Sequence, residues 1–188
     1  MECWRRKPLR GGRLKGQFNA KIAAEFTPPK TWRLQKPLSF QTRLDKDQVA
    51  LLRKVGVNVS SHKTKIFGKV TCKEGMKTDL ASVPRAVWAF ISPWDVARAA
   101  VIHDHLYASL RKYFHSSNSQ PAFLSPAQRA NRRKSTWRKA RKLSDNIFLW
   151  GMQSADPPVS GFKIWSAYWS VRLFGRWPAS AKPEGQEK

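Results

Sequence analysis

The stretch AAVIHDHLYASLRKY, residues 99–113, carries ionisable side chains that need polar partners from the rest of the chain. Apolar residues recur in it at intervals of three and four, which predicts an amphipathic helix over residues 93–113. His103 and Asp104 lie at or near the edge of its inward face, and Tyr107 follows one turn later. A buried carboxylate destabilises a fold unless it is paired, so this helix needs polar partners from elsewhere in the chain.

The composition indicates a basic globular protein with room for one domain. The 188 residues include 36 Lys and Arg against 12 Asp and Glu, which gives a net charge of +24. Self-repulsion at that charge favours a polyanionic partner, such as nucleic acid or an acidic membrane surface. Cys3 and Cys72 offer neither a disulfide framework nor a metal-binding spacing, and no apolar run is long enough to form a transmembrane segment.

The pattern along the first half of the chain predicts a small sheet. Residues 31–42 and 65–76 have the composition of strands. The first stretch is interrupted at Pro37, and the second is expected to carry a bulge at Gly68. Residues 44–56, between the two, are expected to form a short helix.

The second half predicts helices. Ser125 followed by Pro126 is typical of a helix start, and we expect a long helix that reaches about residue 153. A third helix is expected to follow the ADPP turn and to end at Gly175.

Together these elements indicate an α+β fold, a small antiparallel sheet packed against about three helices. The globular domain is expected to cover residues 27–177. Residues 1–26 are expected to form a flexible basic arm and residues 178–188 a polar tail.

A second acid is expected to point inward from the 126–153 helix. Asp145 shares a helix face there with Phe148 and Met152, and Asp79 lies in the loop that precedes the 93–113 helix. We therefore expect a candidate catalytic cluster where two helices and a loop meet. Its members are Asp79, His103, Asp104, Asp145 and the neighbouring Tyr107.

Three carboxylates beside one histidine require a counter-charge. The imidazolium, Arg85 and a bound Ca²⁺ are the candidates, and Asp79 and Asp104 are the candidate metal ligands. The alternative is a structural network in which Tyr107 and Thr78 help to lock the loop to the helices. Clusters of this kind favour a functional site without requiring one.

The chain also resembles a family of phage and prophage proteins called domain of unknown function 1353. The resemblance rests on GMKTDLASVPR, AAVIHDHLY, the inward Asp145 and the late YWSVRLFG, and it covers about residues 31–176. Met76 departs from it, since the family usually has an aromatic residue there, and the basic segment 111–142 is longer than expected. The resemblance implies a phage or prophage origin and a shared site at Asp79, His103, Asp104 and Asp145. With that origin we expect the protein in the virion or in the host cytoplasm, with other virion proteins among its partners. The resemblance implies no reaction.

A looser similarity links His103-Asp104-x-x-Tyr107 to the helix motif of secreted phospholipases. In those enzymes the histidine is the general base and the next aspartate binds calcium, while the tyrosine and an aspartate on an antiparallel helix hold the network. Asp145 is the candidate for that last role. The chain has neither the glycine-rich calcium loop nor the disulfides of those enzymes, so the similarity is one of mechanism only.

The first half of the 126–153 helix is predicted to bind phosphate groups. No acidic residue separates Asp104 from Asp145, so basic side chains there lack the glutamates that usually alternate with them. Trp137 within the run suits stacking on bases or contact with lipid headgroups, and no sequence-reading module is visible. The candidate nucleic-acid-binding residues are Arg129, Arg132, Arg133, Lys134, Trp137, Arg138, Lys139, Arg141 and Lys142.

Two hypotheses from different classes remain open. One is a non-catalytic, virion-associated or host-directed phage protein that binds nucleic acid or another polyanion. The other is a hydrolase with His103 as general base and Asp79, Asp104 and Asp145 orienting it or holding Ca²⁺.

Overall fold

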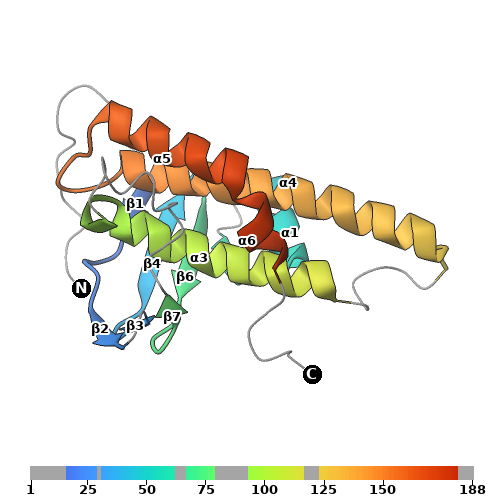
Figure 1. Cartoon of the computed structure of the whole chain (residues 1–188), viewed down its shortest axis with the longest axis horizontal. Coiled ribbons are helices and arrows are strands. Elements are labelled where there is room, and N and C mark those ends of the chain that lie inside the picture. The colour runs from blue at the N-terminus through green and yellow to red at the C-terminus, as the bar shows by residue number, and fades with distance from the viewer. Residues whose placement is uncertain (1–15, 29–30, 62–66, 79–92, 117–122, 182–188) are drawn as a thin grey trace.

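The computed structural model describes residues 16–28, 31–61, 67–78, 93–116 and 123–181, except for the side chains of residues 93–95. Within these ranges it forms a single α+β domain with two antiparallel sheets and five helices (Figure 1). The strands are β1 (Gly16–Phe18), β2 (Ala24–Thr27), β3 (Thr31–Leu34), β4 (Leu38–Thr42), β5 (Val59–Ser61), β6 (Gly68–Cys72) and β7 (Lys77–Thr78). The helices are α1 (Lys46–Lys54), α3 (Pro93–His115), α4 (Pro126–Gln153), α5 (Gly161–Phe174) and α6 (Arg176–Ser180).

The strands form one sheet of order β1-β4-β6-β5 and one of order β2-β3-β7. β4 and β6 pair without interruption, and Thr42 lies opposite Gly68. The predicted bulge at Gly68 is therefore wrong. What the glycine provides is space, because a Cβ at this position would lie 2.5 Å from Cδ1 of Leu44.

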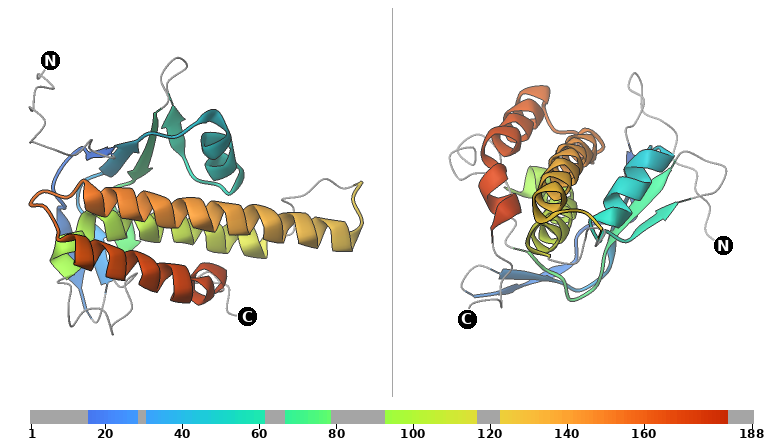
Figure 2. Two further views of the ribbon diagram at one scale, coloured as in Figure 1. Left: turned by 90° about the horizontal axis from the view of Figure 1, so that it is seen from above. Right: turned by 90° about the vertical axis from the view of Figure 1, so that its right-hand side faces the viewer.

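The antiparallel pair of α3 and α4 occupies the middle of the molecule (Figure 1). One side of the pair packs against β4, β6 and α1, and the other side carries α5 and α6 (Figure 2). The apolar core is divided in the same way. Phe40 and Leu106 belong to the cluster on the sheet side, whereas Phe148 and Ile164 belong to the cluster under α5.

Local signals place α1 and α4 where the sequence predicts them, whereas α6 is not predicted. α4 begins with a capping box in which the backbone N–H of Gln128 donates to Oγ of Ser125 at 3.2 Å. The same arrangement starts α1, where the N–H of Gln48 donates to Oδ1 of Asp45 at 2.7 Å. Gly175 follows α5 as predicted.

Both ends of the predicted domain need correction. β1 pairs with β4 and β2 pairs with β3, so a flexible arm over residues 1–26 is wrong from residue 16 onward. α6 extends into the predicted tail and buries Ala179, because α3 holds it by hydrogen bonds from Arg111 and His115 to its backbone carbonyls. Residues 1–15 and 182–188 lie outside the described residues.

Gly68→Ala should lower the free energy of unfolding by about 1–3 kcal/mol, because the added methyl group overpacks the core against Leu44. Gly161→Ala is the matched control, since a Cβ at the start of α5 meets nothing within 4 Å. Urea denaturation should show that the control is as stable as the parent or slightly more so. Equal losses in both variants would contradict the packing role of Gly68.

Candidate functional site

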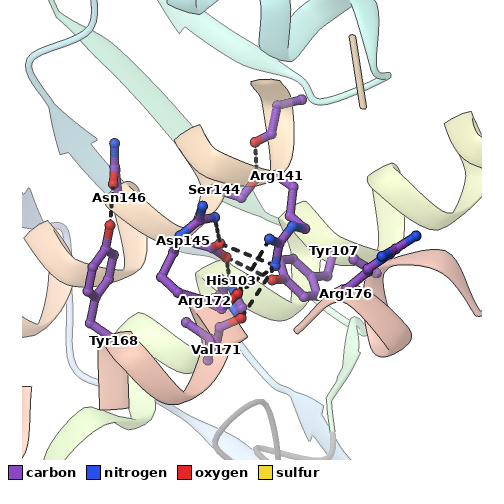
Figure 3. A network of polar contacts seen from close by, with 12 residues as sticks. His103, Tyr107, Arg141, Ser144, Asp145, Asn146, Tyr168, Val171, Arg172 and Arg176 are labelled. Carbon is purple, nitrogen blue, oxygen red and sulfur yellow. Dashed lines mark hydrogen bonds and ion pairs between the residues drawn. The ribbon is translucent and has the colours of Figure 1, made fainter. Parts of the chain in front are cut away.

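Asp145 is the centre of a buried polar network that joins α3, α4 and α5 (Figure 3). Its Oδ1 accepts a hydrogen bond from the hydroxyl of Tyr107 at 2.7 Å and lies 3.0 Å from Nε2 of His103. Its Oδ2 accepts a hydrogen bond from Nη1 of Arg172 at 2.5 Å, and Nη1 of Arg141 lies 3.8 Å away. Three helices therefore converge on one carboxylate.

Close packing holds the rings of this network in place. His103 and Tyr107 are four residues apart on α3, and their ring centroids are 4.0 Å apart. The ring of Phe148 lies 4.9 Å from that of His103. A Cβ on Gly175 would lie 2.4 Å from the hydroxyl oxygen of Tyr107, so this glycine allows the junction between α5 and α6 to approach the network.

The protonation of the network follows from burial and from its cations. Burial alone would raise the pKa of Asp145, but hydrogen bonds and charge from His103, with hydrogen bonds from Arg172 and Tyr107, outweigh it and lower the pKa. Burial, followed by the nearby charge of Asp145, raises the pKa of Tyr107 well above its usual value. Asp145 is therefore ionised at neutral pH, and the phenol of Tyr107 stays protonated as its donor.

The two ring nitrogens of His103 differ, because Nε2 contacts Asp145 and Nδ1 does not. Nδ1 is buried and has no hydrogen-bond partner among the described residues. When Nε2 carries the proton and donates it to Asp145, Nδ1 keeps a lone pair that can accept a proton. The arrangement has the parts of a general base with an orienting acid.

Asp104 belongs to a different contact on the sheet side of α3. Thr78, at the end of β7, donates a hydrogen bond to Oδ2 of Asp104. Burial and then the charge of Asp104 raise the pKa of the Cys72 thiol to about 12, so Cys72 is a protonated thiol. Thr78 and Tyr107 both act as hydrogen-bond partners, as predicted, but they serve two different carboxylates.

Of the four ionisable groups predicted to converge, the structure brings one pair into contact. His103 and Asp145 are in contact, whereas Asp104 is held by Thr78. Asp79 and Arg85 lie outside the described residues. In the part of the chain that the structure describes, no group of three or more His, Cys, Asp and Glu could hold a metal ion. Ca²⁺ at Asp79 and Asp104 therefore stays a prediction.

Besides His103, two arginines bring positive charge to Asp145, and the sequence does not predict either of them in the site. The sequence predicts no role for Arg172 and places Arg141 on the basic surface. Arg141 is half-buried, and its guanidinium also donates to the carbonyl oxygen of Arg172, near the end of α5. The sequence signal for placing Arg141 in the site is its position four residues before Asp145, because residues i and i+4 are neighbours on a helix.

The basic half of α4 extends beyond α5 and α6 (Figure 1). A shallow depression of about 520 Å³ lies along it, lined by Lys134, Arg138, Lys139 and the polar Asn131 and Ser135. The exposed candidates for phosphate binding are Arg132, Lys134, Arg138, Lys139 and Lys142, while Arg129 and Arg133 are half-buried. Arg133 also donates to the carbonyl oxygen of Ser116.

Trp137 lies in the interior of the protein. It is 4% exposed, and its indole N–H donates to the carbonyl oxygen of Ala179 at 3.3 Å. Stacking on bases, which the sequence suggested for Trp137, is wrong in this fold because α6 covers the ring.

These features define a small α+β protein with a buried histidine–aspartate pair and a basic helix. The family model for "protein of unknown function (DUF1353)" matches residues 54–171, so the chain belongs to that family. No curated protein and no solved structure matches the chain. None of the described helices has both the length and the apolarity needed to cross a bilayer.

Asp145→Asn should be about 3 kcal/mol less stable than the parent at neutral pH, because it leaves Arg172 and Arg141 without a buried counter-charge. The pKa of Asp145 is lowered on folding, so its ionised form stabilises the fold above the unfolded pKa. That contribution is lost as pH falls through the folded pKa. Urea denaturation at decreasing pH should therefore show that the difference in unfolding free energy between the parent and Asp145→Asn becomes smaller.

Asp156→Asn, which changes an exposed acid, is the control. A stability difference between the parent and Asp145→Asn that does not depend on pH would contradict an ionised Asp145.

Proposed function

We propose that this protein binds a phosphate-bearing polyanion through the basic half of α4. The observation that carries the proposal is the row of exposed cations on a helix that has no acidic residue before Asp145. A solvated helix gains stability by alternating charges at i and i+4, which α4 does not do in this half. Like charges repel one another, and phosphates relieve that repulsion.

The contacts are expected to reach phosphates and not base edges. Lys134 and Arg138 line the depression beside α4, where Asn131 and Ser135 add neutral hydrogen-bond donors. These are the side-chain types that bind phosphate oxygens without reading sequence. Burial of Trp137 removes the aromatic platform that would favour single-stranded bases. The resemblance to phage and prophage proteins supports placing this activity in a virion or in the host cytoplasm.

The salt dependence of binding to duplex DNA of random sequence tests this proposal. Each neutralised phosphate contributes about −0.9 to the slope of log affinity against log salt. Replacing Arg132, Lys134, Arg138 and Lys139 with serine should make that slope shallower by about 3.6 if each binds one phosphate, and should weaken binding at low salt. These four are exposed, so the substitutions spare the contacts of Arg133 and Arg141.

A control variant removes the same amount of charge elsewhere. Lys21, Lys36, Lys46 and Lys54 are also exposed and lie on the sheet side and on α1. Fluorescence anisotropy should show that their replacement by serine leaves the slope nearly unchanged. Equal effects of the two sets would mean that net charge alone drives binding, and unchanged binding by the α4 set would make the proposal wrong.

A second candidate function is hydrolysis with His103 as general base, and one specific observation favours it. Nε2 of His103 and the hydroxyl of Tyr107 both contact Oδ1 of Asp145, which leaves Nδ1 as the acceptor. In the phospholipase motif the network around the histidine is also held by a tyrosine and by an aspartate from an antiparallel helix. Nδ1 would take a proton from water as the water attacks an ester, and Asp145 would stabilise the imidazolium.

His103→Gln tests this candidate, with His115→Gln as a control from the end of the same helix. If His103 is the base, release of fatty acid from phospholipid vesicles with Ca²⁺ should fall at least about 100-fold in His103→Gln and remain in His115→Gln. Thermal denaturation checks that both variants fold. Absence of hydrolysis by the parent protein, together with a lower melting temperature of His103→Gln, would assign the network a structural role only.

A further inference from the structure

The outer side of α5 and α6 is apolar although it faces solvent. The inner side of α5 is buried against α3 and α4 through Ile164, Ala167 and Val171. The outer side repeats large apolar residues at intervals of mostly three and four. We define the α5–α6 apolar face as Phe162 (72% exposed), Trp165 (48%), Trp169 (56%), Leu173 (66%), Phe174 (53%) and Trp177 (71%).

This concentration of exposed apolar side chains is unusual for a monomeric surface and marks an interaction site. Among the described residues, nine large apolar side chains are exposed, and six of them belong to this face. In Figures 1 and 2, α5 forms the outermost helix, on the side of α4 that is turned away from α1 and β5. The face therefore lies outside the core that the described part of the chain forms.

The chemistry of the face fits a lipid interface. Three of its six residues are tryptophan, whose apolar ring and polar N–H suit the boundary between headgroups and acyl chains. Residues 157–181 contain no acidic residue, and Arg176 is exposed between Phe174 and Trp177. Attachment to an anionic membrane surface strengthens with the apolar area buried and with electrostatic attraction to the lipids, and this segment offers both.

The basic half of α4 adds cations on the same side of the molecule. Arg141 reaches the backbone carbonyls near the end of α5. Arg138 and Lys134 precede it by three and seven residues, so they continue along that side of α4. In Figure 2, α5 and α6 lie along one part of α4, and the basic half of α4 continues beyond them along the long axis of the molecule.

We propose that the α5–α6 apolar face docks onto the surface of an anionic lipid bilayer. The aromatic rings and Leu173 enter the headgroup boundary, while Arg176, Lys134 and Arg138 contact lipid phosphates. This inference rests on the proposed polyanion binding for its electrostatic part, and it identifies the phosphates as those of lipid headgroups. The apolar part is independent of it. A second copy of the chain and a nucleic acid are the competing occupants.

Vesicle co-sedimentation with the full chain tests the proposal. The parent protein should bind vesicles of phosphatidylcholine with phosphatidylglycerol more tightly than vesicles of phosphatidylcholine alone. The triple variant Trp165→Ser, Trp169→Ser, Leu173→Ser should lose at least about tenfold in partitioning at fixed salt. The matched triple variant replaces Phe26, Phe67 and Phe123, which are exposed elsewhere, with serine, and it should partition like the parent. Thermal denaturation confirms that both variants fold.

Quenching of tryptophan fluorescence by brominated lipid distinguishes insertion from purely electrostatic attachment. The parent should be quenched on binding, and the variant that lacks Trp165 and Trp169 should lose most of that quenching. Equal partitioning of the two triple variants would overturn the proposal. So would a dimer, seen by size-exclusion chromatography, that dissociates in the α5 variant while the parent fails to bind vesicles.

Binding of the same proteins to duplex DNA separates this inference from the proposed function. If DNA binding keeps its dependence on the α4 cations while no vesicle binding occurs, the lipid inference is wrong and polyanion binding stands. If the parent binds neither DNA nor anionic vesicles, both are wrong. Vesicle binding that needs the α5–α6 apolar face, with weak or absent DNA binding, supports lipid as the occupant.

Discussion

The ionised carboxylate of Asp145 is the group around which the helical part of this protein is organised. It is fully buried, so each of its oxygen atoms must be compensated inside the protein. His103 and Tyr107 do this from α3, and Arg172 does it from α5. Because hydrogen bonds require short distances and suitable angles, these contacts tie three helices to one carboxylate.

This arrangement also divides the arginines of the chain into two groups. Arg141 and Arg172 are held by Asp145 and by the end of α5, and they are poor candidates for contacts with an external ligand. The cations of the basic half of α4 lie beyond the network, on a helix that extends past α5 and α6 (Figure 1). The exposed cations of this half of α4 therefore lie at one end of the molecule, beyond the point where α5 and α6 end.

The same carboxylate links the structural and the catalytic interpretations of the site. It stabilises the fold as a buried ion pair, and it also orients His103 so that Nδ1 remains the free ring nitrogen. The two roles differ in what they require of Nδ1. A structural role leaves it without a function, whereas catalysis requires water and an ester to reach it.

Much of the fold was determined locally and could be predicted from the sequence. α4 begins at the Ser125 cap and α1 at the Asp45 cap, because N-capping depends on residues within one turn of the helix end. The inward positions of His103, Tyr107 and Asp145 followed from helical periodicity. The presence of a buried acid that needs partners was therefore evident from the sequence by itself.

Only the tertiary structure decided which partners that acid has. Arg172 lies 27 residues from Asp145 along the chain, and no periodicity connects the two. The pairing of β1 with β4, the cover of α6 over Trp137 and the close approach of Leu44 to Gly68 are also contacts between distant segments. Helical periodicity and capping describe neighbours within a few residues, so they determine which side of an element is buried. They cannot determine what it is buried against, because that depends on how all the elements pack together.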